Sequence, residues 1–332
     1  MQICAIYANF HLTLYKYFAE DMVRKTFFAV LAALVTLCSC SRDRYVELTG
    51  YAQGGIYSVK LNLRGVSAPK DEIAAAVDSL LEGIDNSLSG YNKGSLLSRY
   101  NAGQEIEPDR FWTEINELSD KYSGMTGGAF DVAGAPLFDI WGFGFTTDSL
   151  PSPDAVSAAL EQCRRREKLN FNAIAQGYSC DVIAEYLHSV GVKDMLVNIG
   201  EIYCEGLNPR GEDWSIGIDT PFDGNYTPGA SLSGIWRSRG RACGIVTSGN
   251  YRKFYIKDGR KYAHTIDPRT GYPVGHSLLS ATVVAPTAAE ADALATACMV
   301  LGPDAAREFI ESHDGLEACL ISADSTWTSP GF

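Results

Sequence analysis

Apolar residues recur at intervals of three and four along five stretches of the chain, a spacing that places them on one face of a helix. We therefore expect helices over residues 69–84, 111–126, 153–166, 175–190 and 287–301. Thr287 and Glu290 form a capping box at the start of the last helix, and Gly302 ends it. Gly191 ends the helix over 175–190 in the same way.

Shorter stretches in which apolar and polar residues alternate, or in which apolar residues run together, predict strands. Asp258-Gly259 is typical of a type I′ turn, so its flanks are expected to pair as a hairpin. The expected strands are 51–63, 195–199, 251–257 and 260–266. Strands and helices are mixed without a regular βαβ repeat, which favours an α+β fold, a single compact mixed α/β unit.

The first forty residues have the pattern of a targeting segment. From Met22 the chain carries two basic residues, Arg24 and Lys25, then an apolar run over 27–37 and small residues. The apolar run is too short to span a bilayer. We expect 1–21 to be an upstream mis-start, 22–39 a signal peptide and 40–332 the folded domain.

Composition narrows the classes of partner. The chain has 332 residues, is 46% hydrophobic and has a formal net charge of -12. An acidic chain whose one basic run is 164–166 lacks the clustered cations that nucleic acid requires, so we expect no nucleic-acid partner. Six cysteines of the expected domain are spread singly without zinc-site spacing, which favours buried small hydrophobes, although a disulfide among them stays open.

One candidate for metal binding lies on the helix expected over 287–301. Asp292 and Thr296 are four residues apart and so share a face. A carboxylate and a hydroxyl are hard oxygen ligands of the kind that Mg²⁺ prefers. The alternative is a solvated aspartate and a threonine that bonds back to a main-chain carbonyl. Almost all the surrounding residues are apolar, which makes the pair unusual.

Two other segments suit ligand contact. Gly127 and Gly128 would let a ligand approach the backbone, and Phe130 beside Asp131 offers a flat face. The alternative is a buried segment in which Asp131 caps a turn. Thr247 and Ser248 place two hydroxyls before the expected hairpin, where they form either a phosphate contact or an ordinary loop.

The segment HTIDPRTGYP, residues 264–273, contains more polar groups than a turn requires. Pro268 and Gly271 satisfy the turn by themselves. His264, Asp267 and Arg269 are surplus to it. A histidine at a strand end is either a structural group or a catalyst, and the segment alone does not decide between them.

Five motifs in order along the chain resemble those of the ApbE family of FAD:protein FMN transferases, which have a T-fold-like architecture. The motifs are GGAFDVAGAPLFDIWGFG, AIAQGYSCD, VTSGNYRKFY, HTIDPRTGYPV and EADALATACMVLG. The resemblance runs from about Tyr51 to the C-terminus. The ending Leu37-Cys38-Ser39-Cys40 is similar to a bacterial lipobox, which implies that Cys40 is lipidated.

The resemblance implies an enzyme that binds FAD and Mg²⁺, cleaves the pyrophosphate, releases AMP and attaches FMN to a threonine of an acceptor flavoprotein. It implies an acceptor that is a subunit of a membrane redox complex, and an exported lipoprotein that faces the periplasm from the inner or outer membrane. Two alternatives remain: water replaces the threonine, giving an Mg²⁺-dependent FAD pyrophosphatase, or the chain is a lipid-anchored flavin-binding protein without turnover.

The resemblance also implies site residues. Asp292, Thr296 and the Ala173 carbonyl match the metal ligands, and His264 matches the histidine that assists the acceptor threonine or steadies the pyrophosphate. Arg269 stabilises phosphate charge or holds the turn through Asp267. The matching FAD-contacting positions are Gln53, Tyr91, Ala129, Phe130, Asp131, Asn170, Gln176, Thr247, Ser248 and Ile266.

This chain departs from the usual family pattern at several positions. Asn170 stands where aspartate is common, and Gln176 where lysine or glutamate is common. Gly200-Glu201 is a shortened Gly-Gly-Glu, and Gln53 begins a segment that usually reads Met-Gly-Thr. None of these changes affects Asp292, Thr296 or His264, so we expect activity to be retained.

Overall fold

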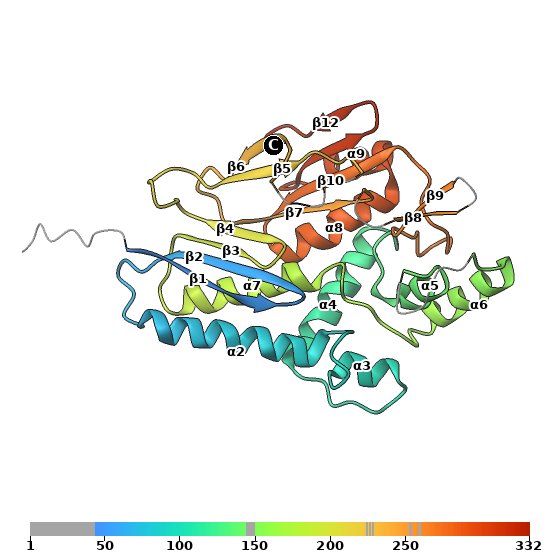
Figure 1. Ribbon diagram of the computed structural model, residues 1–332, viewed down its shortest axis with the longest axis horizontal. Coiled ribbons are helices and arrows are strands. Elements are labelled where there is room, and N and C mark those ends of the chain that lie inside the picture. The colour runs from blue at the N-terminus through green and yellow to red at the C-terminus, as the bar shows by residue number, and fades with distance from the viewer. Residues whose placement is uncertain are drawn as a thin grey trace, which may run out of the picture. The chain divides into compact units, whose positions relative to one another are not determined.

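The computed structural model describes residues 44–143, 150–223, 225, 227, 229–251, 254–257 and 260–332. The chain divides after Arg44, and Tyr45–Phe332 forms one compact unit (Figure 1). The expected signal peptide and Cys40 lie outside the described residues. Among the helices of the described part, none is both long enough and apolar enough to cross a membrane.

The unit is built from helices and mostly short strands. The helical elements are α2 (Lys70–Leu88), α3 (Leu96–Asn101), α4 (Arg110–Met125), the 3-10 turn η1 (Val132–Gly134), α5 (Ala135–Ile140), α6 (Pro153–Arg164), α7 (Ala175–Ser189), α8 (Ala288–Leu301) and α9 (Pro303–Glu311). The strands are β1 (Tyr45–Ala52), β2 (Gly55–Asn62), β3 (Met195–Asn198), β4 (Ile202–Glu205), β5 (Ser215–Asp219), β6 (Leu232–Arg237), β7 (Cys243–Gly249), β8 (Phe254–Lys257), β9 (Arg260–Ala263), β10 (Leu278–Ala285), β11 (Glu317–Ser322) and β12 (Thr326–Thr328).

Eight strands form one antiparallel sheet in the order β1-β2-β3-β4-β7-β10-β11-β12. The pairing of β4 with β7 joins the N-terminal strands to the C-terminal ones, with Cys204 opposite Cys243. Two small hairpins, β5-β6 and β8-β9, lie outside this sheet. Sequence-distant segments therefore meet near the middle of the sheet, where α7 and α8 also pack.

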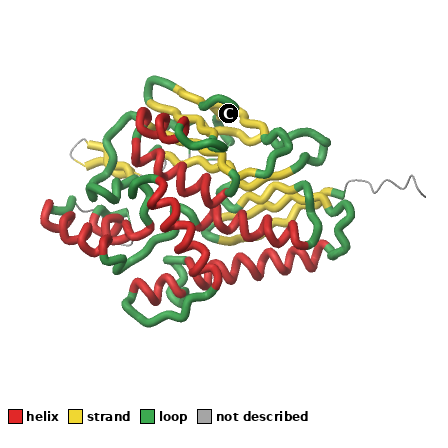
Figure 2. The backbone as a smooth tube through the Cα atoms, turned by 180° about the vertical axis from the view of Figure 1, so that it is seen from behind, coloured by secondary structure: helices red, strands yellow, loops and turns green. Residues whose placement is uncertain are grey.

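Alternation along the central strands separates two apolar layers. On β7, Val246 faces the helical side and packs with residues of α8, whereas Ile245 faces the other side and packs with Trp214 and Trp236. Successive side chains of a strand point to opposite faces, so both faces of the sheet are buried at this central strand. Helices cover one face, as the view from behind shows (Figure 2).

Helices α7 and α8 cross so closely that glycine is required at the contact. A Cβ on Gly177 would lie 2.3 Å from the Ala288 carbonyl oxygen and 2.8 Å from Asp292 Cβ. On the sheet side, a Cβ on Gly244 would lie 2.3 Å from Ala288 Cα. Many residues of α8 are alanines. Their small side chains let the helix pack closely between α7 and the sheet.

The five expected helices are all present, with ends within about one turn of the expected ones. Thr287 caps α8 as expected, since its hydroxyl accepts from the Glu290 amide at 3.2 Å. The single strand expected over 51–63 is wrong. The chain reverses at Gln53 and Gly54, which both have positive φ, and Tyr51–Ala52 belong to β1.

The expected hairpin near residue 258 is present as β8 paired with β9, with shorter arms than expected. Its Asp258-Gly259 turn lies outside the described residues. The six cysteines of the described unit are buried and free, as small hydrophobes would be, and no disulfide joins any of them. The α+β class is confirmed by the mixed helices and the antiparallel sheet.

Candidate active site

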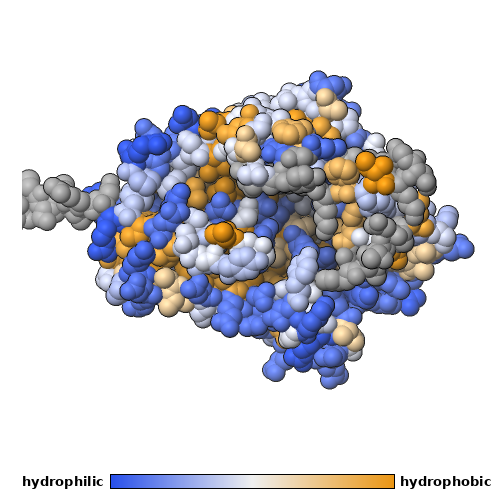
Figure 3. All heavy atoms as spheres, viewed as in Figure 1, coloured by the Kyte–Doolittle hydropathy of each residue, from blue (hydrophilic) through white to orange (hydrophobic). Residues whose placement is uncertain are grey.

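A cavity of about 380 Å³ lies where the N-terminal end of α7, the middle of α8, the end of β7 and the segment before η1 converge. The molecule is visibly hollowed near the centre of the face in Figure 3. Eleven of the residues predicted for the site line this cavity. They are Ala129, Phe130, Asp131, Asn170, Ala173, Thr247, Ser248, His264, Ile266, Asp292 and Thr296.

The cavity brings together the three residues that are expected to bind a metal through oxygen atoms. Asp292 is 4% exposed and accepts a hydrogen bond from the Gly177 amide at 3.1 Å. Thr296 lies one turn further along α8, with its hydroxyl 3.3 Å from that of Ser248, and Ala173 lines the same space. One carboxylate, one hydroxyl and one main-chain carbonyl form a hard oxygen set that leaves room for phosphate oxygens, so these residues fit Mg²⁺.

Burial changes the electrostatics of Asp292. The pKa of its carboxyl is raised to about 7, chiefly by desolvation and also by the nearby Asp181 charge, while the hydrogen bond from the Gly177 amide acts to lower it. A buried carboxylate with one amide donor is costly unless a cation or further donors meet it. The position of Asp292 is therefore better explained by a charged ligand than by the apolar helix around it.

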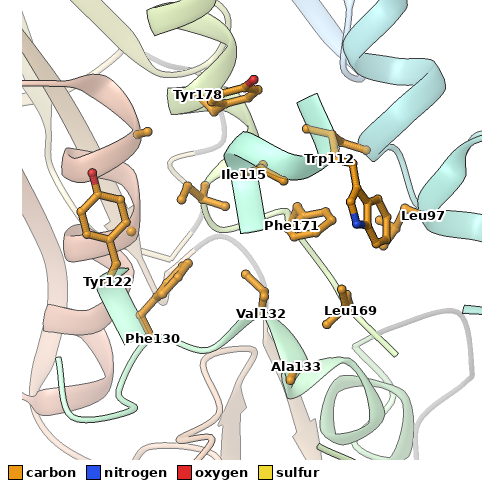
Figure 4. Packing of buried hydrophobic residues seen from close by; sticks show 14 of the residues in the cluster. Leu97, Trp112, Ile115, Tyr122, Phe130, Val132, Ala133, Leu169, Phe171 and Tyr178 are labelled. Carbon is orange, nitrogen blue, oxygen red and sulfur yellow. The ribbon is translucent and has the colours of Figure 1, made fainter. Parts of the chain in front are cut away.

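The glycine-rich segment before η1 contributes both backbone and side chains. Gly127 and Gly128 have positive φ, and the Asp131 carboxylate accepts from the Ala133 amide at 2.8 Å. The turn-capping alternative for Asp131 is thus present, and Asp131 lines the cavity as well. Phe130 is 2% exposed and packs in the apolar cluster with Val132 (Figure 4). This cluster fixes the segment against the cavity.

His264 follows β9 and lines the cavity, with its ring 6.4 Å from that of Phe143 in an edge-on arrangement. Ile266 is buried nearby and pairs with Pro273 across the turn. The histidine is therefore placed by the turn at the cavity wall, on the same cavity as Asp292.

Asp267 and Arg269 pair with each other rather than lining the cavity. The Asp267 carboxylate accepts from Arg269 Nε at 2.9 Å and from its terminal nitrogen at 2.8 Å, and it also accepts from the Arg269 main-chain amide. This pairing raises the pKa of the Arg269 guanidinium. These hydrogen bonds support the alternative in which Arg269 holds the turn through Asp267. The catalytic roles of both residues stay predictions.

A second cavity, of about 380 Å³, gathers the remaining predicted contacts. Gln53, Tyr91 and Gln176 line it, at the β1-β2 turn, the loop after α2 and the start of α7. Gln53 also donates to the Ser179 hydroxyl, which ties the turn to α7. The predicted FAD-contacting residues thus line two cavities, which share Asn172. The two cavities together offer space for the two halves of an extended ligand.

Asn172 and Glu201 are two of the cavity-lining residues that were not among the predicted site residues. Asn172 lines both cavities and also a third one, of about 440 Å³, which extends past Asn170 and Lys168. Glu201, directly before β4, lines the first cavity. Asn172 directly precedes Ala173 of the AIAQG motif, and that position was its one available signal. Glu201 had a signal in the shortened Gly-Gly-Glu segment, which was noted as a departure from the family pattern and not as a site residue.

Comparison with known proteins identifies the family of this chain. The sequence model of the ApbE family matches residues 53–320. A Klebsiella pneumoniae protein named FAD:protein FMN transferase is 31% identical, over 92% of this chain and 97% of the relative. An Escherichia coli K12 protein of the same name is 30% identical, over 92% of this chain and 95% of the relative.

Solved structures give the same relationship. The apo form of the Pseudomonas stutzeri flavinyl transferase ApbE superposes with a TM-score of 0.76 at 31% identity, covering 87% of this chain and 95% of that one. The Vibrio cholerae flavin transferase ApbE gives a TM-score of 0.74 at 29% identity, covering 87% and 98%. Sequence and structure agree over most of the chain, and the chain belongs to the ApbE family.

Proposed function

We propose that this chain transfers FMN from FAD to a threonine of an acceptor flavoprotein, in a reaction that depends on Mg²⁺. The observation that carries the proposal is the meeting of Asp292, Thr296 and Ala173 with Asp131 and His264 around one cavity. Its relatives are named for this transfer. A second cavity lined by Gln53 and Gln176 gives space for the rest of an FAD molecule.

The reaction exchanges one phosphorus–oxygen bond for another. The acceptor hydroxyl oxygen bonds to the phosphorus of the FMN half, and the bond from that phosphorus to the bridging oxygen breaks. AMP leaves with the bridging oxygen, and the hydroxyl gives up its proton. His264, at the cavity wall, is placed to take that proton.

The proposed metal ligands have a different role. Asp292, Thr296 and the Ala173 carbonyl would hold Mg²⁺, which supplies positive charge against the pyrophosphate oxygens. Thr247 and Ser248, at the end of β7, line the same space with hydroxyl donors. Gly127 and Gly128, which have positive φ and no side chain, lead into Ala129–Asp131 at the cavity wall and leave the backbone before them open to a ligand.

The test combines the full chain with FAD, Mg²⁺ and a candidate acceptor flavoprotein domain. We expect the acceptor to gain the mass of FMN on one threonine, with one AMP released per FMN attached. AMP and free FMN without a mass gain would replace the transferase by a pyrophosphatase. Bound but unchanged FAD would leave a flavin-binding protein without turnover.

We also propose that Cys40 carries a lipid anchor that holds the enzyme at a membrane surface facing the periplasm, within reach of a membrane redox complex. The support is the pattern of basic, apolar and small residues that ends at Cys40. We expect Cys40→Ser to move the protein from the membrane fraction to the soluble fraction, and Cys38→Ser to leave it at the membrane. Equal distribution of both variants with the wild type would remove the anchor.

A further inference from the structure

A second aspartate, half-buried on α7, lies close to the start of the helix that carries Asp292. Asp181, on the second turn of α7, accepts from the Ala288 amide with one carboxylate oxygen and from the Ala289 amide with the other, both at 2.8 Å. These are the first two amides of α8, and main-chain amides at a helix start have no partner within the helix. Asp181 therefore caps α8 from a different helix.

The contact between the two helices is reciprocal. The Gly177 amide, near the start of α7, donates to Asp292 of α8, while the first amides of α8 donate to Asp181 of α7. Each helix thus supplies a carboxylate to the N-terminal end of the other. Such an exchange favours one relative position of α7 and α8, because a slide along either helix lengthens bonds at both ends.

Close packing around Ala288 restricts movement of α7 and α8 relative to each other. Gly177 and Gly244 hold the Ala288 backbone from two sides, with no space for a Cβ on either glycine. Asp292 follows Ala288 by one helical turn, so the place of Ala288 sets the place of the Asp292 carboxylate. Ala173 lies just before α7 and lines the same cavity as Asp292. The contact between α7 and α8 therefore also sets the distance between these two residues.

We propose that Asp181 is a positioning residue, whose two-oxygen cap on α8 holds Asp292 and Thr296 at the distance from the Ala173 carbonyl that a divalent cation requires. This role rests on the proposed metal-dependent function, and Asp181 does not line the cavity itself. Outer partners of this kind set the orientation of metal ligands, and their loss typically weakens metal binding about 10- to 100-fold.

The variant Asp181→Asn tests the role because it keeps the size of the side chain. An amide offers one oxygen acceptor, so its NH₂ group must face the second helix amide, and α8 shifts to relieve that contact. Asp109→Asn is the matched control. Asp109 caps α4 by accepting from the Trp112 amide at 2.8 Å, and α4 carries none of the proposed ligands.

The measurement is the binding of Mn²⁺ to the full chain, followed by electron paramagnetic resonance, together with the Mg²⁺ dependence of AMP release from FAD. In Asp181→Asn we expect the dissociation constant for Mn²⁺ to rise at least about tenfold. The Mg²⁺ needed for half-maximal rate should rise in parallel, with much of the rate recovered at saturating Mg²⁺. Asp109→Asn should change neither value by more than about twofold.

A second variant covers the case in which Asp181→Asn does not fold. Asp181→Glu keeps both oxygen acceptors and adds one methylene, so it should fold and bind Mn²⁺ with intermediate affinity. Wild-type Mn²⁺ affinity in folded Asp181→Asn overturns the positioning role, as does loss of folding in both variants. Where Asp181→Asn does not fold, wild-type affinity in Asp181→Glu overturns it as well. A wild-type chain that binds no Mn²⁺ and cleaves no FAD is a different result, because it removes the proposed function itself.

Discussion

Asp292 supplies the carboxylate among the proposed metal ligands, and its side chain is almost completely buried. Its carboxylate has one main-chain donor, Gly177, and its pKa is raised to about 7 by burial. Asp292→Asn removes the charge and keeps an oxygen for the Gly177 amide. We expect FAD cleavage to fall about 100-fold or more, since a metal ligand stabilises the transition state by several kcal/mol.

The same variant should keep or raise the melting temperature, because a desolvated charge is removed from the interior. The check is AMP release against Mg²⁺ concentration beside a thermal melt. Wild-type turnover with unchanged Mg²⁺ dependence would exclude Asp292 as a ligand. A large drop in melting temperature would instead assign it to the α7–α8 contact.

His264 gives a second prediction at the same scale. His264→Ala should lower the rate of FMN transfer about 100-fold, the usual size of a general-base contribution, while FAD binds within about threefold of wild type. Rates come from acceptor mass gain and affinity from FAD titration. His313→Ala, a histidine outside the cavity, is the control. Equal losses in binding and rate would make His264 a structural residue.

The sequence predicted these side chains unevenly, for physical reasons. The spacing of Asp292 and Thr296 is local to one helix, so periodicity alone places them on one face. Gln53 and Gln176 meet only because β1-β2 packs near α7, and no local pattern encodes that contact. Glu201 lies directly before β4, whose pairing with the distant β7 has no local signal in the sequence.

At the scale of elements, the close crossing of α7 and α8 depends on a residue without a side chain. Gly177→Ala would place a Cβ 2.3 Å from the Ala288 carbonyl oxygen, a main-chain atom that cannot rotate away. We expect a loss of about 3 kcal/mol, at the upper end of overpacking costs, and a melting temperature lowered by about 5 °C or more.

Gly124→Ala provides the comparison, because Gly124 is exposed on α4 and a Cβ there meets nothing within 4 Å. That change should be neutral or stabilise by up to about 1 kcal/mol, the ordinary gain of alanine over glycine in a helix. Thermal melts of both variants at equal pH decide the matter. A Gly177→Ala melt equal to wild type would mean that the helices can separate at no cost.

Elements with a strong periodic or turn signal were predicted well, and several strands without such a signal were not. The helices α2, α4, α6, α7 and α8 follow from apolar spacing and from caps such as Thr287. The reversal at Gln53 was missed because a non-glycine residue takes positive φ there, which makes the turn hard to recognise. Strands β10 and β11 are buried on both faces and lack alternation, so they offered no pattern to read.

At the scale of the whole molecule, the compact unit should work without the residues before it. The large sheet, the helices on its face and both cavities lie within Tyr45–Phe332. We expect a fragment of residues 45–332 to melt within about 2 °C of the full chain and to release AMP from FAD at a similar rate, because no described contact of the site lies before residue 45.

A fragment of residues 56–332 is the matched comparison. It lacks β1 and the turn with Gln53, so β2 becomes the sheet edge with unpaired main-chain groups, and the buried Leu48 leaves the apolar cluster beneath. This fragment should melt lower and aggregate, and its folded fraction should bind FAD more weakly because Gln53 is missing from the second cavity. If 45–332 loses FAD cleavage as 56–332 does, the first forty-four residues take part in the active unit, and the division after Arg44 does not separate anchor from enzyme.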